Sequence, residues 1–167
     1  NELVHGRWLL SAFYAHSLEA RPETDWEPMA DHEERTARLC RRFLKRIDPA
    51  LAPWGDVLGR WHDLGKYLRA YQEKIRSPDP ARIRVEHSLP GALFASRQAG
   101  PLGRALAFVI AGHHTGLANA KNNEPRSLAR GCITRTPLEQ RLENGEPLLA
   151  RQPPDLPERL KRSPVLE

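Results

Sequence analysis

Apolar side chains recur at helical spacing in four successive stretches of this 167-residue chain, and that pattern most strongly limits its fold. The stretches cover about 31–47, 54–75, 86–98 and 102–114, and prolines or glycines stand in the breaks between them. No stretch shows a convincing strand pattern. We therefore predict a compact all-α fold whose helices bury their apolar faces against one another.

The first expected helix has two candidate starts. Asp31, followed by Glu34, resembles a capping box, whereas Pro28 would suit an earlier start. Its buried stripe is expected on the face that carries His32, Thr36, Leu39, Cys40, Phe43 and Ile47.

The two ends of the chain carry weaker patterns. An apolar patch around Trp8 predicts a short helix or an extended arm. The proline-rich segment 121–167 is expected to be largely irregular, with short helices at 127–133 and 138–142. We predict one domain over 1–167, with its core at about 12–120.

Composition narrows the class of protein. The net charge of +5 and the pI of about 9.6 are compatible with a polyanionic partner such as nucleic acid. Cys40 and Cys132 form neither a disulfide framework nor a zinc ribbon, which suits a reducing compartment. No apolar run approaches the roughly 20 residues of a membrane span. These features predict a cytoplasmic protein that does not enter the membrane.

Histidines stand on or near the apolar face of every expected helix. Taken singly, each is more often a hydrogen-bonded core or surface residue than a metal ligand. Together, the packed helices would bring five imidazoles and a carboxylate into one pocket, where the ring nitrogens need partners that metal ions can supply. The predicted ligands are His32, His62, Asp63, His87, His113 and His114.

This ligand set predicts a catalytic metal site. It exceeds the four ligands of a structural zinc site, and it suits one or two ions of manganese, iron, cobalt or nickel, with magnesium as a further candidate. Two ions bridged by Asp63 could activate water against a phosphoester. Lys66 is then either a positive charge near the scissile phosphate or a solvated surface lysine. Ser88 either binds phosphate or caps a helix.

The order of these motifs resembles the HD superfamily of metal-dependent phosphohydrolases. It is more closely similar to the HD nuclease domain of CRISPR-associated protein three, the helicase-nuclease of type I CRISPR interference. The match covers about residues 12–120. It is carried by Tyr14-Ala15-His16-Ser17, Trp26-Glu27-Pro28-Met29, His32, His62-Asp63-Leu64-Gly65-Lys66, Tyr71-Gln72, Glu86-His87-Ser88, Gly91-Ala92 and Gly112-His113-His114-Thr115-Gly116-Leu117.

The resemblance implies a helical HD fold in which those six residues bind one or two divalent ions and Lys66 assists near the phosphate. It also implies metal-dependent cleavage of single-stranded DNA in antiviral defence. The DNA would be fed by a helicase outside this sequence and delivered through a crRNA-guided surveillance complex. His16 and Gln72 match family positions close to the site, without an implied ligand role.

One feature departs from the family pattern. A further aspartate normally follows the double histidine on a later helix, whereas Asp155, among prolines, is the only aspartate after the pair here. We expect that the sequence stops before that helix, as a vector-like Leu166-Glu167 end would suit, and that one metal position therefore has a ligand fewer.

Two alternative functions remain open at this stage. One is an HD phosphohydrolase acting on nucleotides or cyclic dinucleotides, which the basic charge disfavours. The other is a degenerate metal-binding HD module that docks a partner, which the missing aspartate favours.

Overall fold

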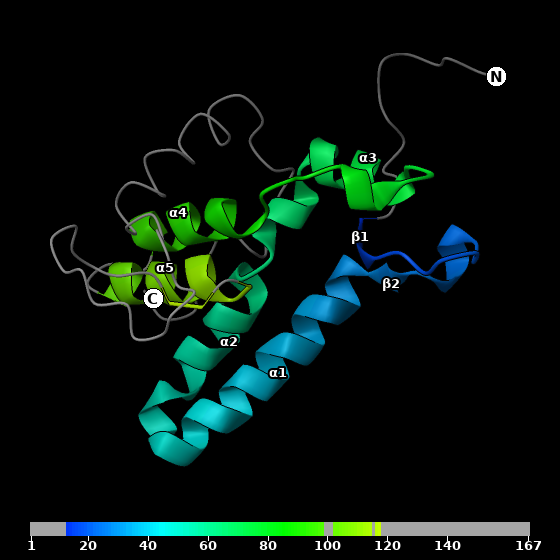
Figure 1. The fold of residues 1–167 in the computed structure, drawn as a ribbon. Helices are drawn as coiled ribbons and strands as arrows, with labels where there is room; N and C mark the ends of the chain where they lie inside the picture. Colours follow the sequence, from blue (N-terminus) through cyan, green and yellow to red (C-terminus); the bar gives the residue numbers. More distant parts are fainter. Residues whose placement is uncertain (1–12, 99–101, 115, 118–167) are drawn as a thin grey trace, which may run out of the picture.

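The computed structural model describes residues 13–98, 102–114 and 116–117, and this part of the chain is mostly helical (Figure 1). The prediction of a helical fold is confirmed. The described elements are β1 (Tyr14–His16), β2 (Glu27–Pro28), α1 (Met29–Ile47), α2 (Ala52–Trp61), α3 (Arg69–Arg76), α4 (Ser88–Gln98) and α5 (Gly103–Gly112).

Helices α1 and α2 form a closely packed antiparallel pair (Figure 1). A Cβ atom built on Gly59 would lie 2.4 Å from the Cα of Ala37, and one built on Gly55 would lie 2.6 Å from the backbone of Cys40. Such short distances leave no room for a side chain at either glycine. The seam between the two helices is therefore made by small residues.

This seam shows that the predicted buried stripe of α1 was wrong. The buried residues of α1 are Met29, Glu33 and Ala37. Leu39, Phe43 and Ile47 are instead 48%, 58% and 75% exposed. Small residues let the backbones of α1 and α2 approach on one face, and these three larger apolar side chains remain exposed.

The single helix predicted over 54–75 is also wrong, because the chain turns immediately after α2. Asp63 has φ −113° and ψ 22°, outside the α-helical region, and a 3₁₀ turn over Leu64–Tyr67 separates it from α3. A Cβ atom on Gly65 would lie 2.2 Å from the carbonyl oxygen of His87. The break thus lets the segment before α4 approach the turn that carries Asp63.

Helices α4 and α5 pack together beside α2 and complete the core (Figure 1). Gly91 allows α4 to approach α2, since a Cβ atom there would lie 2.1 Å from the carbonyl oxygen of Trp61. Trp61 is fully buried in the same hydrophobic cluster as Leu64 and Ile110. Both helices agree with the predicted ranges to within about two residues. This packing places the start of α4 and the end of α5 next to the turn after α2.

A small antiparallel sheet, which the sequence analysis did not predict, covers the start of α1. Tyr14 pairs with Pro28, and His16 pairs with Glu27. The amide of Gln72 holds β1 in place, because its Nε2 donates to the Tyr14 carbonyl at 2.9 Å and its Oε1 accepts from the Tyr14 amide at 3.1 Å. Strands of three and two residues are too short to show an alternating pattern.

Several predictions fall outside the described residues. They concern Trp8, Cys132, the short helices at 127–133 and 138–142, and Asp155. Among the described helices, none combines the length and the apolar character needed to cross a bilayer.

Candidate metal centre

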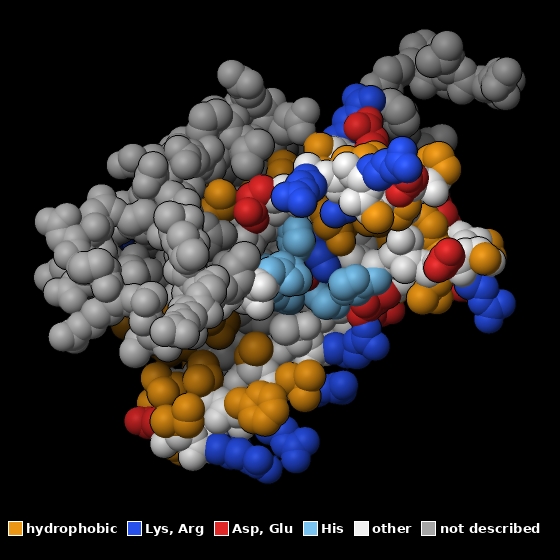
Figure 2. Space-filling model, viewed as in Figure 1, with side chains coloured by type: hydrophobic (Ala, Val, Ile, Leu, Met, Phe, Trp, Pro, Cys, Tyr) orange, Lys and Arg blue, Asp and Glu red, His pale blue; other side chains and the backbone are white. Residues whose placement is uncertain are grey.

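The six predicted ligands lie together where the ends of four helices meet. His32 lies in the first turn of α1, while His62 and Asp63 directly follow α2. His87 directly precedes α4, and His113 and His114 directly follow α5. Histidine side chains gather on one open face of the molecule (Figure 2).

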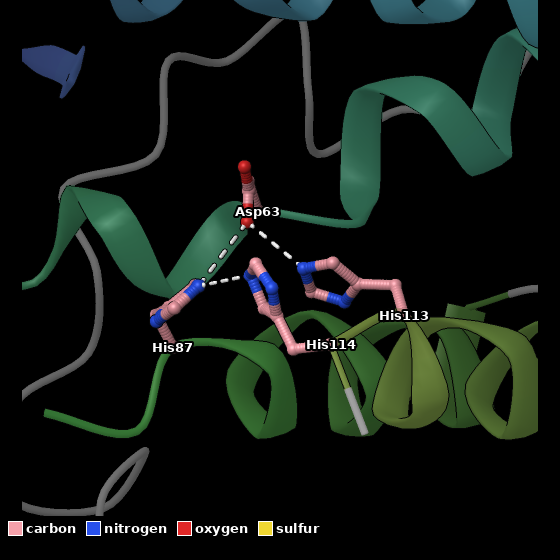
Figure 3. A group of neighbouring side chains, drawn as sticks. All are labelled: Asp63, His87, His113 and His114. Carbon is pink, nitrogen blue, oxygen red and sulfur yellow. Dashed lines mark hydrogen bonds and ion pairs between the residues drawn. The ribbon is translucent and has the colours of Figure 1, made fainter. Parts of the chain in front are cut away.

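Asp63 is the centre of this cluster and is only 2% exposed. Its Oδ2 lies 2.9 Å from Nε2 of His32 and 3.1 Å from Nε2 of His62. Its Oδ1 lies 3.3 Å from Nε2 of His113 and 3.7 Å from Nε2 of His87 (Figure 3). The Nε2 atoms of His87 and His114 are 2.8 Å apart. The two carboxylate oxygens therefore divide the histidines into two groups.

Four of the imidazoles are oriented in the same way, by an acceptor at Nδ1. The acceptors are Gly59 O for His62 at 2.7 Å, Ile110 O for His113 at 2.7 Å, Val85 O for His87 at 3.4 Å and the Glu27 carboxylate for His32 at 3.3 Å. Carbonyl and carboxylate oxygens only accept, so the proton of each neutral ring stands on Nδ1. The Nε2 lone pairs consequently point towards Asp63, which is the usual arrangement of metal-binding histidines.

This orientation explains why Asp63 Oδ1 is buried without a hydrogen-bond donor. His113 and His87 are its nearest ring nitrogens, and both turn a lone pair towards it. Acceptors that face one another in a buried site are costly unless a cation lies between them. Asp63, His87, His113 and His114 each offer a ligand atom within 4.8 Å of the others, and His32, His62 and Asp63 do the same. The cluster is compatible with a divalent metal ion.

The electrostatics of the cluster favour the ligating forms of its side chains. Burial alone would raise the pKa of Asp63, whereas hydrogen bonds from His113, His32 and His62, in the forms that carry a proton on Nε2, would hold that pKa far below its usual range. Burial lowers the pKa of His87 to about 4, and burial together with neighbouring His113 lowers the pKa of His114. Burial thus favours neutral imidazoles at His87 and His114 at neutral pH, which is the form that metal binding requires.

Lys66 lies beneath the cluster and is 2% exposed, which excludes the alternative of a solvated surface lysine. Its Nζ is 2.9 Å from Asp63 Oδ2 and 3.4 Å from Nε2 of His16. The ammonium group therefore balances the charge of Asp63 on the side of His32 and His62. A contact between Lys66 and a phosphate remains a prediction.

Ser88 is the first residue of α4 and is engaged locally. Its Oγ donates to Glu86 Oε1 at 2.6 Å, and its backbone amide donates to the same oxygen at 2.8 Å. The Glu86 carboxylate thus caps the helix with the help of Ser88. A phosphate-binding role for Ser88 remains a prediction.

The helical patterns did not single out Glu27, which lies behind the cluster on β2. Its carboxylate accepts from Nδ1 of His32, forms an ion pair with Arg35 and lies 3.7 Å from Nε2 of His16. His16, Glu27 and His32 could form a further group of ligand atoms. Because the Arg35 guanidinium already occupies Glu27, the geometry suits a residue that orients His32 better than one that binds metal. The sequence motif Trp26-Glu27-Pro28-Met29 contains this residue without indicating a role, and the pairing with His16 across the small sheet shows where it lies.

No protein-family model matches this sequence, and no curated protein matches it.

Proposed function

We propose that the chain is an HD-type, metal-dependent nuclease domain that cleaves single-stranded DNA. The observation that carries the proposal is the shared orientation of the histidines. Four Nδ1 atoms are held by acceptors while their Nε2 atoms surround Asp63, whose Oδ1 has no hydrogen-bond donor. A structural cluster of hydrogen-bonded histidines would pair that oxygen with an N–H group.

The residues that would hold metal fall on the two sides of Asp63. Oδ1 lies with His87, His113 and His114, and Oδ2 lies with His32 and His62. A bound divalent ion would supply an activated water nucleophile and stabilise charge on the phosphate. The chain itself orients the imidazoles through their Nδ1 acceptors and places the Lys66 cation beside the Asp63 carboxylate.

The proposed substrate and partners follow from the motif order and from charge. A net charge of +5 favours a polyanion over a small nucleotide as substrate. We extend the proposal to a cytoplasmic role in type I CRISPR interference, with a helicase that delivers the single strand and a crRNA-guided surveillance complex that recruits it.

The test is cleavage of labelled single-stranded DNA in the presence of manganese, cobalt, nickel, iron(II) or magnesium, with EDTA as the blank. We expect cleavage with transition metals, none in EDTA, and none from Asp63→Asn or His113→Ala. Asp63→Asn preserves the volume of the side chain and an oxygen that can accept from Lys66. Asp79→Asn, in an exposed loop, is the matched control and should cleave at the wild-type rate.

Two results would contradict the proposal. Cleavage at the wild-type rate by Asp63→Asn would show that the histidine cluster is not needed for the reaction. Hydrolysis of nucleotides or cyclic dinucleotides without DNA cleavage would identify a nucleotide phosphohydrolase instead. If the protein binds metal stoichiometrically but turns over none of these substrates, the docking-module alternative is supported.

A further inference from the structure

Besides Arg41, which lies 3.9 Å from Asp56, the C-terminal half of α1 carries four exposed cations that the histidine site does not use: Arg38, Arg42, Lys45 and Arg46. None of them forms an ion pair or a side-chain hydrogen bond within the described part of the chain. Other arginines on the helix pair are engaged, since Arg35 pairs with Glu27 and Arg60 pairs with Glu34 and Asp56.

These cations line a continuous path along the helix. From Arg38 to Arg46 the helix rises about 12 Å, at 1.5 Å per residue. An open hollow of about 850 Å³ follows this row and is bounded on its other side by Pro49 and Pro53. Arg38 also lines a second hollow, of about 510 Å³, which reaches His16 and Glu27 at the edge of the histidine cluster. Lys and Arg side chains of α1 lie on the same face as the histidines (Figure 2).

Stabilisation of the helix dipole explains only part of this row. Lys45 and Arg46 lie in the last turn of α1, where cations complement the negative end of the dipole. Arg42 and Arg38 stand one and two turns earlier respectively, where that effect has faded. Phe43, 58% exposed, stands three residues before Arg46, so its ring is a neighbour of that cation on the helix surface. Cations interleaved with an exposed aromatic side chain are typical of surfaces that bind single-stranded nucleic acid.

The acidic side chains in the second hollow would not prevent the binding of a nucleic acid, because most of them form ion pairs with arginines. Asp25, Glu27 and Glu34 are paired with Arg21, Arg35 and Arg60 respectively. Asp31 is the exposed acid of that hollow without such a pair among the described residues. The positive charge along α1 is therefore in excess.

We propose that this face of α1 binds the phosphate backbone of a single-stranded nucleic acid whose chain continues towards the histidine cluster. At about 3.4 Å per nucleotide of a stacked strand, the 12 Å row spans three to four phosphates. The inference extends the proposed function by locating the strand, but the binding itself requires neither metal nor cleavage.

The experiment measures binding of a fluorescent oligothymidylate by anisotropy across a salt series, in EDTA. In the variant Arg38→Ala/Arg42→Ala, two phosphate contacts are removed. Each phosphate contact with a single strand contributes about 0.7 to the slope of log K against log salt, where K is the association constant. Losing two contacts should therefore flatten the slope by about 1.4, and the affinity at 0.1 M salt should fall roughly 25-fold. Circular dichroism should match that of the wild type, because both side chains are exposed.

The matched control is Arg69→Ala/Arg82→Ala, which lowers the net charge from +5 to +3 just as the test variant does. These two arginines lie off α1 and are paired with Glu73 and Asp79. Binding by the control should stay within about threefold of the wild type. An equal loss of affinity in both variants would show that only the overall charge matters, and it would overturn the proposal. An unchanged salt slope in Arg38→Ala/Arg42→Ala would overturn it too.

Anionic phosphatidylserine vesicles form the second arm, because a basic helix with exposed Leu39, Phe43 and Ile47 could also meet a membrane surface. Tighter binding to vesicles than to the oligonucleotide, lost in Arg38→Ala/Arg42→Ala, would overturn the nucleic-acid assignment. Absence of cleavage in the separate metal assay would leave the binding result standing, so the two proposals fail independently.

Discussion

Replacing Asp63 with alanine should destabilise the metal-free protein strongly, through the lysine that it leaves behind. Lys66 and Asp63 are both 2% exposed, and Lys66 Nζ lies 2.9 Å from Asp63 Oδ2. Removing one member of a buried ion pair leaves an uncompensated charge in a poorly solvated site. Such changes cost about 3–5 kcal/mol. We expect a loss of that size in the free energy of unfolding of Asp63→Ala.

The assay is thermal unfolding in EDTA, followed by circular dichroism. For a domain of this size, each 1 kcal/mol shifts the Tm by about 2–4 °C, so the variant should melt about 6–20 °C below the wild type. Asp63→Asn should lose less, because its amide oxygen can still accept a hydrogen bond from the ammonium group of Lys66.

A double-mutant cycle isolates the pair. Lys66→Met removes the ammonium while keeping a similar apolar length, so Asp63→Ala/Lys66→Met should be more stable than Asp63→Ala alone. A wild-type Tm in Asp63→Ala would refute the reasoning, and so would a double variant no more stable than the single one. If the prediction holds, loss of activity in Asp63→Ala mixes unfolding with loss of a ligand, and Asp63→Asn is the better test of chemistry.

Three further changes test other parts of the site. Glu27→Ala should lower the affinity for a transition metal about tenfold, which is the lower end for a residue that orients a ligand, because the hydrogen bond from His32 to Glu27 is long. Calorimetric titration should show a metal affinity near that of the wild type for Glu27→Gln. An equal loss of affinity in Arg35→Ala would assign the effect to the ion pair between Arg35 and Glu27 instead. Gly65→Ala should lower the free energy of unfolding, measured with denaturant, by about 1–3 kcal/mol or more, because a Cβ atom there would lie 2.2 Å from the His87 carbonyl oxygen. Wild-type stability of this variant would contradict that close approach. Burial lowers the pKa of His87 to about 4, so between about pH 6.5 and pH 4 the unfolded chain binds more protons than the folded one. The free energy of unfolding of the metal-free protein should therefore fall as the pH drops through this range, by at most about 1.4 kcal/mol per pH unit for each histidine of this kind. A pH profile of stability that His87→Gln leaves unchanged would count against this prediction.

The helical class and the convergence of the histidines could be predicted because both depend on local periodicity. Each of His62, His87 and His113 stands at the edge of an apolar stripe, and stripes that pack together bring their edges together. Helix ends were predicted less well inside 54–75. There, no proline marks the break, and the turn at Asp63 is stabilised by long-range packing of Gly65 against the segment before α4.

The buried face of α1 could not be read from hydrophobicity. Apolar patterns weight Leu39 and Phe43 heavily, whereas the packing against α2 depends on Ala37 and on two glycines that carry little hydrophobic signal. Glu27 was hidden for a different reason. It lies on the two-residue strand β2, immediately before α1, where no periodic pattern marks its approach to His32 five residues further on.

The two sides of Asp63 differ in a way that predicts the order of metal binding. The Oδ1 side offers four ligand atoms, including three imidazoles, and its oxygen has no hydrogen-bond donor. The Oδ2 side offers three, and the ammonium group of Lys66 already lies against that oxygen. Like charges at 4 Å repel by about 4 kcal/mol per pair of unit charges near a protein surface, so a cation on this side must displace or tolerate Lys66. A metal titration should therefore show one tight site that His113→Ala removes and one weaker site that Lys66→Met strengthens. Two equal sites in the wild type would mean that Lys66 leaves Asp63 when metal binds.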